Sequence, residues 1–266
     1  MDFFSLLLNQ KADDKIGVCL EWELPALTEN LKMLSKSFQL VTYGQKIDGI
    51  EYGGRSSDPS ADLIEDYLSH KICGFVRGIN DDYTFQRKFK SALDTPRLMR
   101  LAFMKDVHGR EFCLGPLSAS EAVDKEDRLQ FTLKAASFIK AFGVVPSVAV
   151  MSACRPGSVN YSASNKESWE ESDYIVDELR KRGYEADNVG IELEKSAGNY
   201  HLIIPVRGII GNQIFRTLTF LGGGEVLGVP AFGFDNPAIC YEDNSRNEEN
   251  YENHIKAALL WSKICK

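Results

Sequence analysis

Several signatures of catalysis are missing from this chain of 266 residues. It contains no P-loop, no G-x-G-x-x-G run after an expected strand and no G-x-S-x-G elbow, so nucleotide hydrolysis and serine hydrolase chemistry have no support. The six cysteines are spread singly without C-x-x-C spacing, and no pair of the four histidines has metal-ligand spacing. We therefore predict no metal, and reduced cysteines.

The chain also lacks a surplus of positive charge and a long apolar run. Its net charge of −7 argues against broad binding to nucleic acid or to an anionic membrane. The apolar stretch within residues 1–10 is too short to span a bilayer and lacks the basic region of a signal peptide. We expect a cytoplasmic, globular protein, since 44% of its residues are hydrophobic and 26% are charged. Its 266 residues are enough for one large or two modest domains.

Apolar strand-like runs alternate with helical patterns along most of the chain. Repeated β-loop-α units predict parallel sheets with helices on both faces. Residues 98–106 and 111–117 flank His108-Gly109, and this pattern is typical of a β-hairpin. The expected strands are 16–20, 39–43, 73–76, 144–153, 202–206 and 238–241, and the expected helices are 25–38, 58–70, 82–93, 124–142, 172–182, 212–221 and 244–263, with a loop over 158–168.

Residues 200–224 form the most informative segment, because a strand, a glycine turn and a helix follow one another. Gly208 and Gly211 mark the expected turn, and Asn212 is placed to cap the helix. Free amides at a helix start favour an anion, and Arg216 lies one turn further on. Such turns also serve merely to reverse the chain in α/β proteins, so a structural role is an equally good interpretation.

The same segment resembles the carboxyl-terminal signature of the phosphate acetyl- and butyryltransferase family, through the motif IIP…GNQ…LTFLGGGEVLG. The runs MSACRPG (151–157) and DNSRN (243–247) make the chain most similar to one branch, the methanogen marker protein 4 group, described as a methyltransferase-linked subunit X. The resemblance is firm from about residue 146 to residue 246 and weak over the first hundred.

The resemblance implies a two-lobed, three-layer α/β/α fold of the isocitrate/isopropylmalate dehydrogenase type, with mostly parallel sheets and the hairpin as a clasp between lobes. Residues 1–112 plus 229–266 would form the first lobe and 113–228 the second, with the active cleft between them. The implied reaction is acyl transfer between coenzyme A and phosphate, with no tightly bound cofactor, a small anionic ligand and a homodimer. Two alternatives stay open: a subunit of a methanogen methyl-transfer system with methyltransferase partners, and a non-catalytic protein that senses such a ligand.

The pair Ser245-Arg246 is expected to open the last helix. Ser245 would cap it and Arg246 would neutralise a phosphate; equally, Ser245 or Asn244 simply caps while Arg246 is solvated. The resemblance implies that the pair lines an acyl-phosphate and coenzyme A cleft, although the preceding Glu242 and Asp243 add acidic charge there. Glu252 lies where acetyl-branch enzymes have an acid that acts as base, but its charge run is also typical of a solvated helix face.

Three further segments bear on the implied chemistry. Phe220 stands where acetyltransferases of the family have an arginine. The resemblance therefore implies either the arrangement of the butyryl branch, which has a Leu-Thr-Phe-Leu run here, or a lineage that has lost acetyl chemistry. Arg77-Gly78 follows a strand where butyryl-type relatives have Lys-Gly, so Arg77 faces a ligand or is simply a surface arginine. Arg155 and Ser158 follow the strand ending near residue 153, and either grip an anion or belong to a structural turn.

Overall fold

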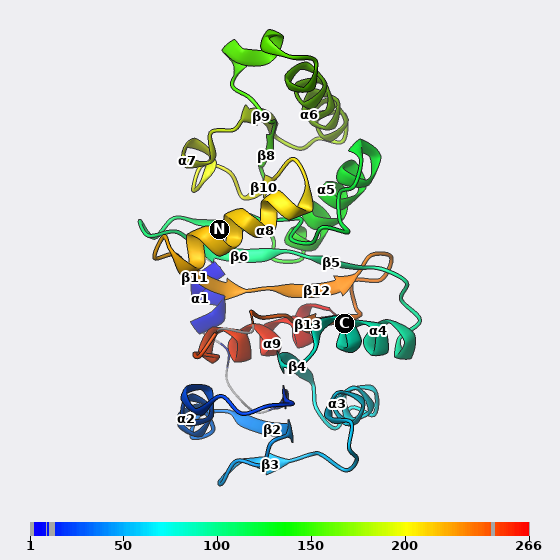
Figure 1. The fold of residues 1–266 in the computed structure, drawn as a ribbon, viewed down its shortest axis with the longest axis vertical. Helices are drawn as coiled ribbons and strands as arrows, with labels where there is room; N and C mark the ends of the chain where they lie inside the picture. The colour runs from blue at the N-terminus through cyan, green and yellow to red at the C-terminus, as the bar shows by residue number, and fades with distance from the viewer. Residues whose placement is uncertain (1–2, 9, 11–13, 246–247, 266) are drawn as a thin grey trace. The chain divides into compact units, whose positions relative to one another are not determined.

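A computed structural model describes residues 3–8, 10, 14–245 and 248–265, and in it the chain forms two compact units (Figure 1). Unit 1 comprises Met1–Phe3 and Met99–Val226, and unit 2 comprises Phe4–Leu98 and Leu227–Lys266. The chain thus passes from unit 2 into unit 1 at Met99 and returns to unit 2 at Leu227.

The sheet of unit 2 has the strand order β3-β2-β1-β4-β13-β12-β5. Its strands β1, β2, β3, β4 and β13 pair in parallel, whereas β12 is antiparallel to β13. The bounds are β1 Lys15–Leu20, β2 Gln39–Gly44, β3 Glu51–Tyr52, β4 Gly74–Ile79, β13 Cys240–Glu242, β12 Pro230–Gly233 and β5 Leu98–Arg100. The expected strands 16–20, 39–43 and 73–76 are therefore confirmed.

Helices cover both faces of this sheet. Successive residues of a strand point to opposite faces, so neighbouring residues of β4 pack against different helices. Val76 faces a core with α2 (Pro25–Leu34) and α9 (Glu252–Ile264), whereas its neighbour Phe75 faces α3 (Pro59–Leu68) and α4 (Asp82–Ala92). The start of α3 is as expected, since the side chain of Asp58 accepts a hydrogen bond from the Ala61 amide at 3.1 Å. A short helix, α1 (Phe3–Leu8), precedes β1.

The sheet of unit 1 has the order β11-β6-β7-β10-β8-β9. The hairpin is confirmed, since β6 and β7 pair antiparallel, while β10 lies parallel between β7 and β8. The strands are β6 Ala102–Lys105, β7 Glu111–Leu114, β8 Val148–Met151, β9 Ala186–Gly190, β10 Leu202–Ile204 and β11 Glu225–Gly228, and the helices are α5 Lys125–Lys140, α6 Ala163–Lys181, α7 Leu193–Ser196 and α8 Gly208–Phe220, with the 3-10 helix η1 Pro156–Tyr161.

Three expectations about element bounds were wrong. The expected loop over 158–168 is instead η1 followed by the first turns of α6, which Ser162 caps through the Asn165 amide. The last helix begins at Glu252 and not at residue 244. The strands β9, β11 and β12 were not expected. β9 (ADNVG) is largely polar, and the short apolar runs of β11 and β12 lie next to glycines and prolines that suggest turns.

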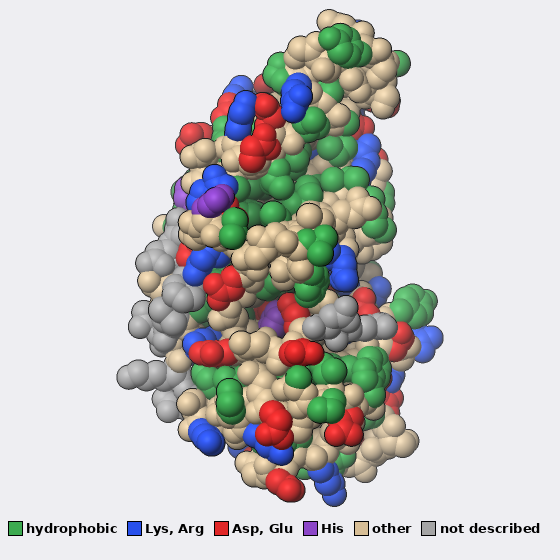
Figure 2. All heavy atoms as spheres, turned by 60° about the vertical axis from the view of Figure 1, so that its left-hand side comes forward, with side chains coloured by type: hydrophobic (Ala, Val, Ile, Leu, Met, Phe, Trp, Pro, Cys, Tyr) green, Lys and Arg blue, Asp and Glu red, His purple; other side chains and the backbone are tan. Residues whose placement is uncertain are grey.

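The surface agrees with the composition. On the face drawn in Figure 2, basic and acidic side chains are interspersed and do not gather into a patch of one sign. Among the described residues, no helix combines the length and the apolar character that crossing a membrane requires.

Candidate functional site

The carboxyl ends of β4 and β13 meet in unit 2, because the two strands are parallel neighbours with Val76 opposite Glu242. Arg77, on β4, is buried there and binds the segment that follows β13. Its Nε donates to Asp243 Oδ1 at 2.5 Å, its Nη1 donates to Asn80 Oδ1 at 2.9 Å, and its Nη2 donates to the Asn244 carbonyl. Two segments far apart in the sequence are thus joined by one guanidinium.

Gly78 completes this junction with its backbone. Its backbone amide donates to Asn244 Oδ1 at 2.8 Å, and the side-chain Nδ2 of Asn244 donates to the Gly78 carbonyl at 3.1 Å and to the Tyr251 hydroxyl at 2.7 Å. Gly78 has φ +77°, and a Cβ here would lie 1.9 Å from the Cys19 carbonyl oxygen. We call Arg77, Gly78, Asp243 and Asn244 the clamp. The contacts of the clamp give the Arg77-Gly78 motif a structural role, because they fix the chain just before Ser245.

The charge of Arg77 is matched within the clamp. Burial would lower its pKa, but Asp243 and then Asp82 outweigh burial and raise it above its ordinary value. Its guanidinium is therefore ionised and paired, at 2.5 Å, with the Asp243 carboxylate. The side chain is buried, so the expectation of a surface arginine is wrong, and its observed contacts hold the chain in place.

A second chain of groups lies next to the clamp: the buried Glu242 and His254 and the half-buried Glu248, called here the acid–histidine relay. Glu242 Oε1 lies 2.5 Å from His254 Nδ1 and accepts from the Val229 amide at 2.7 Å, while Oε2 accepts from Trp261 Nε1 at 2.5 Å. On the other side, His254 Nε2 lies 3.2 Å from Glu248 Oε2. The same Glu248 oxygen accepts from the Ser245 amide at 2.5 Å, so the relay ends on the chain at Ser245.

The relay holds a charged imidazole. Burial alone would lower the pKa of His254, but Glu248 and then Glu242 outweigh burial and raise it to about 10. His254 therefore carries a proton at neutral pH, and both of its ring nitrogens donate to carboxylates. An ionised imidazole between two carboxylates can fix the position of the half-buried Ser245.

The predicted catalytic residues Ser245, Arg246 and Glu252 do not open a helix together. Helix α9 begins at Glu252 after Tyr251, so Ser245 lies seven residues before its start and does not cap it. Arg246 lies outside the described residues. Glu252 is exposed, and its Oε1 lies 2.5 Å from Lys256 Nζ, an i, i+4 pair that fits the solvated-face interpretation.

The glycines of residues 200–224 serve close packing. Helix α8 begins at Gly208 with Arg207 as its N-cap, so the expectation that Asn212 caps it was wrong. A Cβ on Gly208 would lie 1.8 Å from the Ser118 carbonyl oxygen, and one on Gly211 would lie 2.0 Å from that of Pro116. These glycines let the helix backbone approach the 115–121 loop closely.

The remaining contacts of this segment are also local. Asn212 donates from Nδ2 to the Leu117 carbonyl at 2.9 Å and so ties α8 to the same loop. Arg216 is exposed, and its guanidinium lies over the Phe220 ring at 5.1 Å. The contacts of this segment are therefore packing contacts, and Arg216 is its exposed charged side chain.

Arg155 and Ser158 lie together in unit 1, at the start of η1. The Ser158 amide donates to the Arg155 carbonyl at 2.9 Å, and the Ser158 carbonyl accepts from Asn165 Nδ2 at 2.8 Å. Arg155 Nε lies 3.9 Å from Glu192 Oε1, with its side chain largely exposed. These contacts are those of a structural turn that leaves the Arg155 charge near solvent.

Arg128 was missed by the sequence reasoning and lies at the carboxyl ends of β8 and β10. It is fully buried, and its Nη2 donates to the Met151 carbonyl at 2.5 Å and to the Ile204 carbonyl at 3.1 Å, while Nη1 donates to Ser172 Oγ at 3.2 Å. Burial, followed by the nearby Arg207, lowers the pKa of Arg128 to about 9. Helical periodicity placed position 128 on α5 but gave no sign that an arginine there closes two strand ends.

The relay was missed as well, since His254 was one of four scattered histidines with no spacing that suggests ligands. Within the described residues, no group of three His, Cys, Asp or Glu side chains is placed to hold a metal ion. Among the predicted site residues, unit 2 contains Arg77, Ser245 and Glu252, and unit 1 contains Gly211, Asn212, Arg216, Arg155 and Ser158.

Solved structures support the fold class. The structure is similar to a branched-chain phosphotransacylase from Enterococcus faecalis V583, with a TM-score of 0.73, 14% identity and coverage of 93% of this chain and 98% of that one. It is also similar to a phosphotransacetylase from Streptococcus pyogenes, with a TM-score of 0.69, 13% identity and coverage of 98% of each chain. The predicted isocitrate dehydrogenase-like α/β fold is thereby confirmed.

Sequence relatives add a narrower grouping, although no model of a protein family matches the chain. A Methanosarcina mazei protein named "Putative methyltransferase mtx subunit X" is 30% identical over 233 residues, which cover 86% of this chain and 82% of the relative. A Methanosarcina barkeri protein of the same name is 28% identical over 211 residues, covering 79% and 77%. With its phosphotransacylase fold and these methanogen relatives, the chain belongs to the mtx subunit X family.

Proposed function

We propose that this protein binds a phosphate-bearing ligand of the acyl phosphate or coenzyme A type and transfers an acyl group between coenzyme A and phosphate. The observation that carries the proposal is the clamp, which fixes the chain before Ser245 at the carboxyl end of β4. In parallel α/β sheets, ligands bind beyond the carboxyl ends of the strands. The phosphotransacylase fold supports the same ligand class.

The proposed chemistry needs a hydroxyl and positive charge near the reacting carbonyl. When the thiol of coenzyme A attacks an acyl phosphate, negative charge develops on the carbonyl oxygen, and donors fixed in advance stabilise it most. Ser245 is the proposed donor, since its amide is held by Glu248 and its side chain is half-buried. Arg246 is the proposed cation, and the proposed ligand contacts are Arg155, Ser158, Gly211, Asn212 and Arg216. Glu252 is exposed and paired with Lys256, so we do not expect it to act as the base.

The test is thioester formation. Purified protein is incubated with acetyl phosphate or butyryl phosphate and coenzyme A, and the thioester is measured by its absorbance. Ser245→Ala is expected to lower the rate, whereas Ser91→Ala, on the exposed face of α4, is expected to leave it unchanged. No thioester above background with either acyl phosphate would refute acyl transfer.

A non-catalytic ligand-binding role is the nearest alternative, and three observations favour it. Arg77 is already paired with Asp243, Glu252 is exposed beside Lys256, and Phe220 stands in place of the acetyl branch's arginine. Isothermal titration with coenzyme A distinguishes the two roles. Saturable binding without thioester formation identifies a sensor, whereas turnover excludes it.

A second candidate function follows from the names of the relatives, which describe a subunit of a methyltransferase. We propose as the alternative that this chain assembles with methyltransferase components in a methanogen, and that it forms a homodimer by itself. Affinity purification of the tagged chain from methanogen cells tests the first part, with corrinoid or coenzyme M methyltransferases as the expected partners. Light scattering after gel filtration tests the second, and a monomer mass would overturn it.

A further inference from the structure

Acyl transfer to coenzyme A needs a base, and Glu252, the residue expected in that role, is exposed and paired with Lys256. The thiol of coenzyme A reacts as its thiolate, and a free thiol has a pKa of about 8.5. At neutral pH a group of the protein therefore has to take the proton. The acid–histidine relay brings two carboxylates to the Ser245 region, those of Glu242 and Glu248, and their surroundings differ.

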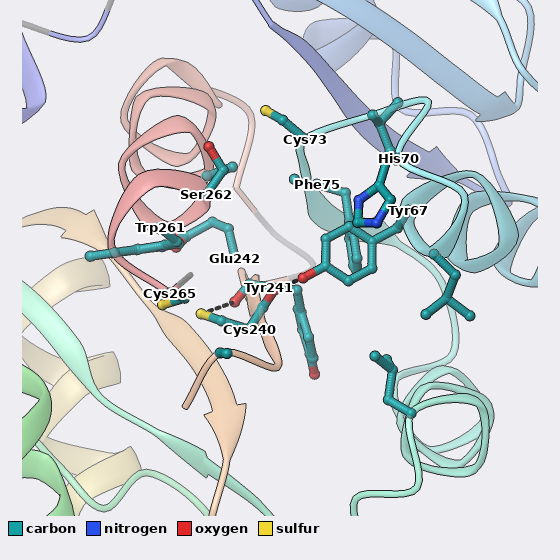
Figure 3. A pocket seen from close by; sticks show the side chains of 16 residues that line it. Tyr67, His70, Cys73, Phe75, Cys240, Tyr241, Glu242, Trp261, Ser262 and Cys265 are labelled. Carbon is teal, nitrogen blue, oxygen red and sulfur yellow. Dashed lines mark hydrogen bonds between the residues drawn. The ribbon is translucent and has the colours of Figure 1, made fainter. Parts of the chain in front are cut away.

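Glu242 is the closed end of the relay. Its side chain is fully buried, and its two oxygens accept from the Val229 amide at 2.7 Å and from His254 Nδ1 and Trp261 Nε1, each at 2.5 Å. Figure 3 shows Glu242, the last residue of β13, and Trp261 of α9. Both oxygens are occupied by donors of the protein, so Glu242 holds His254 in place and is closed to a ligand.

Glu248 is the open end of the relay. Its Oε2 accepts from the Ser245 amide at 2.5 Å and lies 3.2 Å from His254 Nε2. Its Oε1 has no hydrogen-bond or ion-pair partner among the described residues. The side chain is 11% exposed, and Oε1 is not one of the buried polar atoms that lack a partner, so this oxygen meets solvent. An acceptor beside Ser245 is thus held by its own second oxygen and open on the other.

The charge of the relay favours proton uptake at this open oxygen. Two carboxylates and one imidazolium leave one negative charge in excess. Tyr251 also faces Glu248, and burial, followed by the charge of Glu248, raises the pKa of Tyr251, so its hydroxyl stays neutral at physiological pH. A proton on Oε1 cancels the excess charge, and an uncompensated charge in a largely buried group is costly.

We propose that Glu248 is the general base of acyl transfer, with His254 and Glu242 as the residues that position it. This assignment rests on the proposed function. Glu248 Oε1 takes the proton of the coenzyme A thiol, the sulfur attacks the acyl carbon, and the bond from that carbon to the phosphate oxygen breaks. Phosphate leaves with the electron pair of that bond, and the proton then passes from Glu248 to the phosphate, which restores the carboxylate.

Glu248→Gln tests the proposal, and Glu249→Gln, at the exposed neighbouring position, is the matched control. Glutamine keeps a side-chain oxygen for the Ser245 amide but takes up no proton. At pH 7, thioester formation should fall at least about a hundredfold in Glu248→Gln and by less than about twofold in Glu249→Gln. An unchanged rate in Glu248→Gln beside an active wild type would overturn the proposal, whereas no thioester from the wild type would refute acyl transfer itself.

Two further measurements separate a base from a residue that only holds Ser245. Since a free thiol ionises near pH 8.5, raising the pH from 7 to 9 supplies thiolate without a base, and the loss of kcat/KM in Glu248→Gln should shrink by at least about tenfold. Glu248→Asp keeps a carboxylate and should be at least about tenfold faster than Glu248→Gln at pH 7. Circular dichroism and the Kd for coenzyme A, both expected to match the wild type, verify the fold. A loss that stays constant with pH, or equal rates for the two variants, would overturn the assignment.

Discussion

The acid–histidine relay makes a prediction about stability and pH that can be worked from the structure. His254 is 2% exposed and its pKa is raised from the ordinary 6.5 to about 10, through Glu248 and Glu242. At about 1.36 kcal/mol per pH unit, this difference corresponds to about 5 kcal/mol of folding free energy as an upper limit. Part of it is offset because burial raises the pKa of Glu242 and so makes its ionised form less favourable.

The sign follows from the direction of the shift. Because the folded state holds the proton of His254 more tightly than the unfolded state, the contribution is complete below pH 6.5 and is lost as the pH rises toward about 10. At pH 7, replacing His254 by Gln removes the cation between two buried carboxylates, and should cost about 3–5 kcal/mol. Between pH 7 and pH 9, the wild type should lose about 2–3 kcal/mol that the variant does not lose.

The assay is urea denaturation of both proteins at a series of pH values from 6 to 10, followed by circular dichroism. The quantity to compare is the difference in unfolding free energy between wild type and His254→Gln, because the buried thiols and tyrosines titrate equally in both. His108→Gln, in the exposed hairpin turn, is the matched control and should change stability by less than about 0.5 kcal/mol. A difference that stays constant across this pH range would show that His254 is not ionised in the folded protein.

Three more outcomes test the clamp and the predicted base. Gly78→Ala should lower the unfolding free energy by about 2 kcal/mol or more, because φ is +77° and the new Cβ would lie 1.9 Å from the Cys19 carbonyl oxygen. An unchanged midpoint of urea denaturation would contradict this geometry. Asp243→Asn removes the carboxylate bonded to the buried Arg77 and leaves it only Asp82, whose Oδ1 lies 3.6 Å from the Arg77 Nε. The change should cost about 3 kcal/mol in thermal or urea unfolding, and a neutral result would mean that the pair is solvated. Glu252→Gln should form thioester at a rate within about twofold of the wild-type rate, since the Glu252 side chain is exposed. A loss of about a hundredfold would identify Glu252 as the general base.

Most of the fold was predictable because it depends on local signals. The alternation of apolar runs and helical patterns gave the parallel strands β1, β2 and β4, and Asp58-Pro59 gave the start of α3. The turn at His108-Gly109 gave the antiparallel hairpin β6–β7. Each of these signals lies within a few residues of the feature it determines, so no knowledge of tertiary contacts is required.

The missed features depend on contacts between distant segments. In the sequence, Gly208 and Gly211 suggested a turn. In the structure they are needed because a carbonyl oxygen of the 115–121 loop lies about 2 Å from where each Cβ would be, and a sequence does not show such a contact. Residues 244 and 245 suggested a helix start, but Asn244 is bound to Gly78 and Tyr251, and α9 begins only at Glu252. A capping pattern predicts a helix only where its side chains have no better partner.

The acidic residues before Ser245 show how the structure changes the functional argument. In the sequence, Glu242 and Asp243 place two negative charges beside an expected phosphate site, which argues against a phosphate ligand. In the structure each is paired with a cation, Glu242 with the protonated His254 and Asp243 with Arg77. These two pairs are buried and close to neutral in sum. His254 is however shared with Glu248, whose Oε2 accepts from the Ser245 amide, so one carboxylate charge next to Ser245 has no cation of its own among these groups. The pairing with Asp243 occupies Arg77, so the positive charge that a transferring phosphate requires must come from another residue. Comparing the thioester rates of Ser245→Ala and Arg246→Ala decides whether Arg246, next to Ser245, supplies that charge.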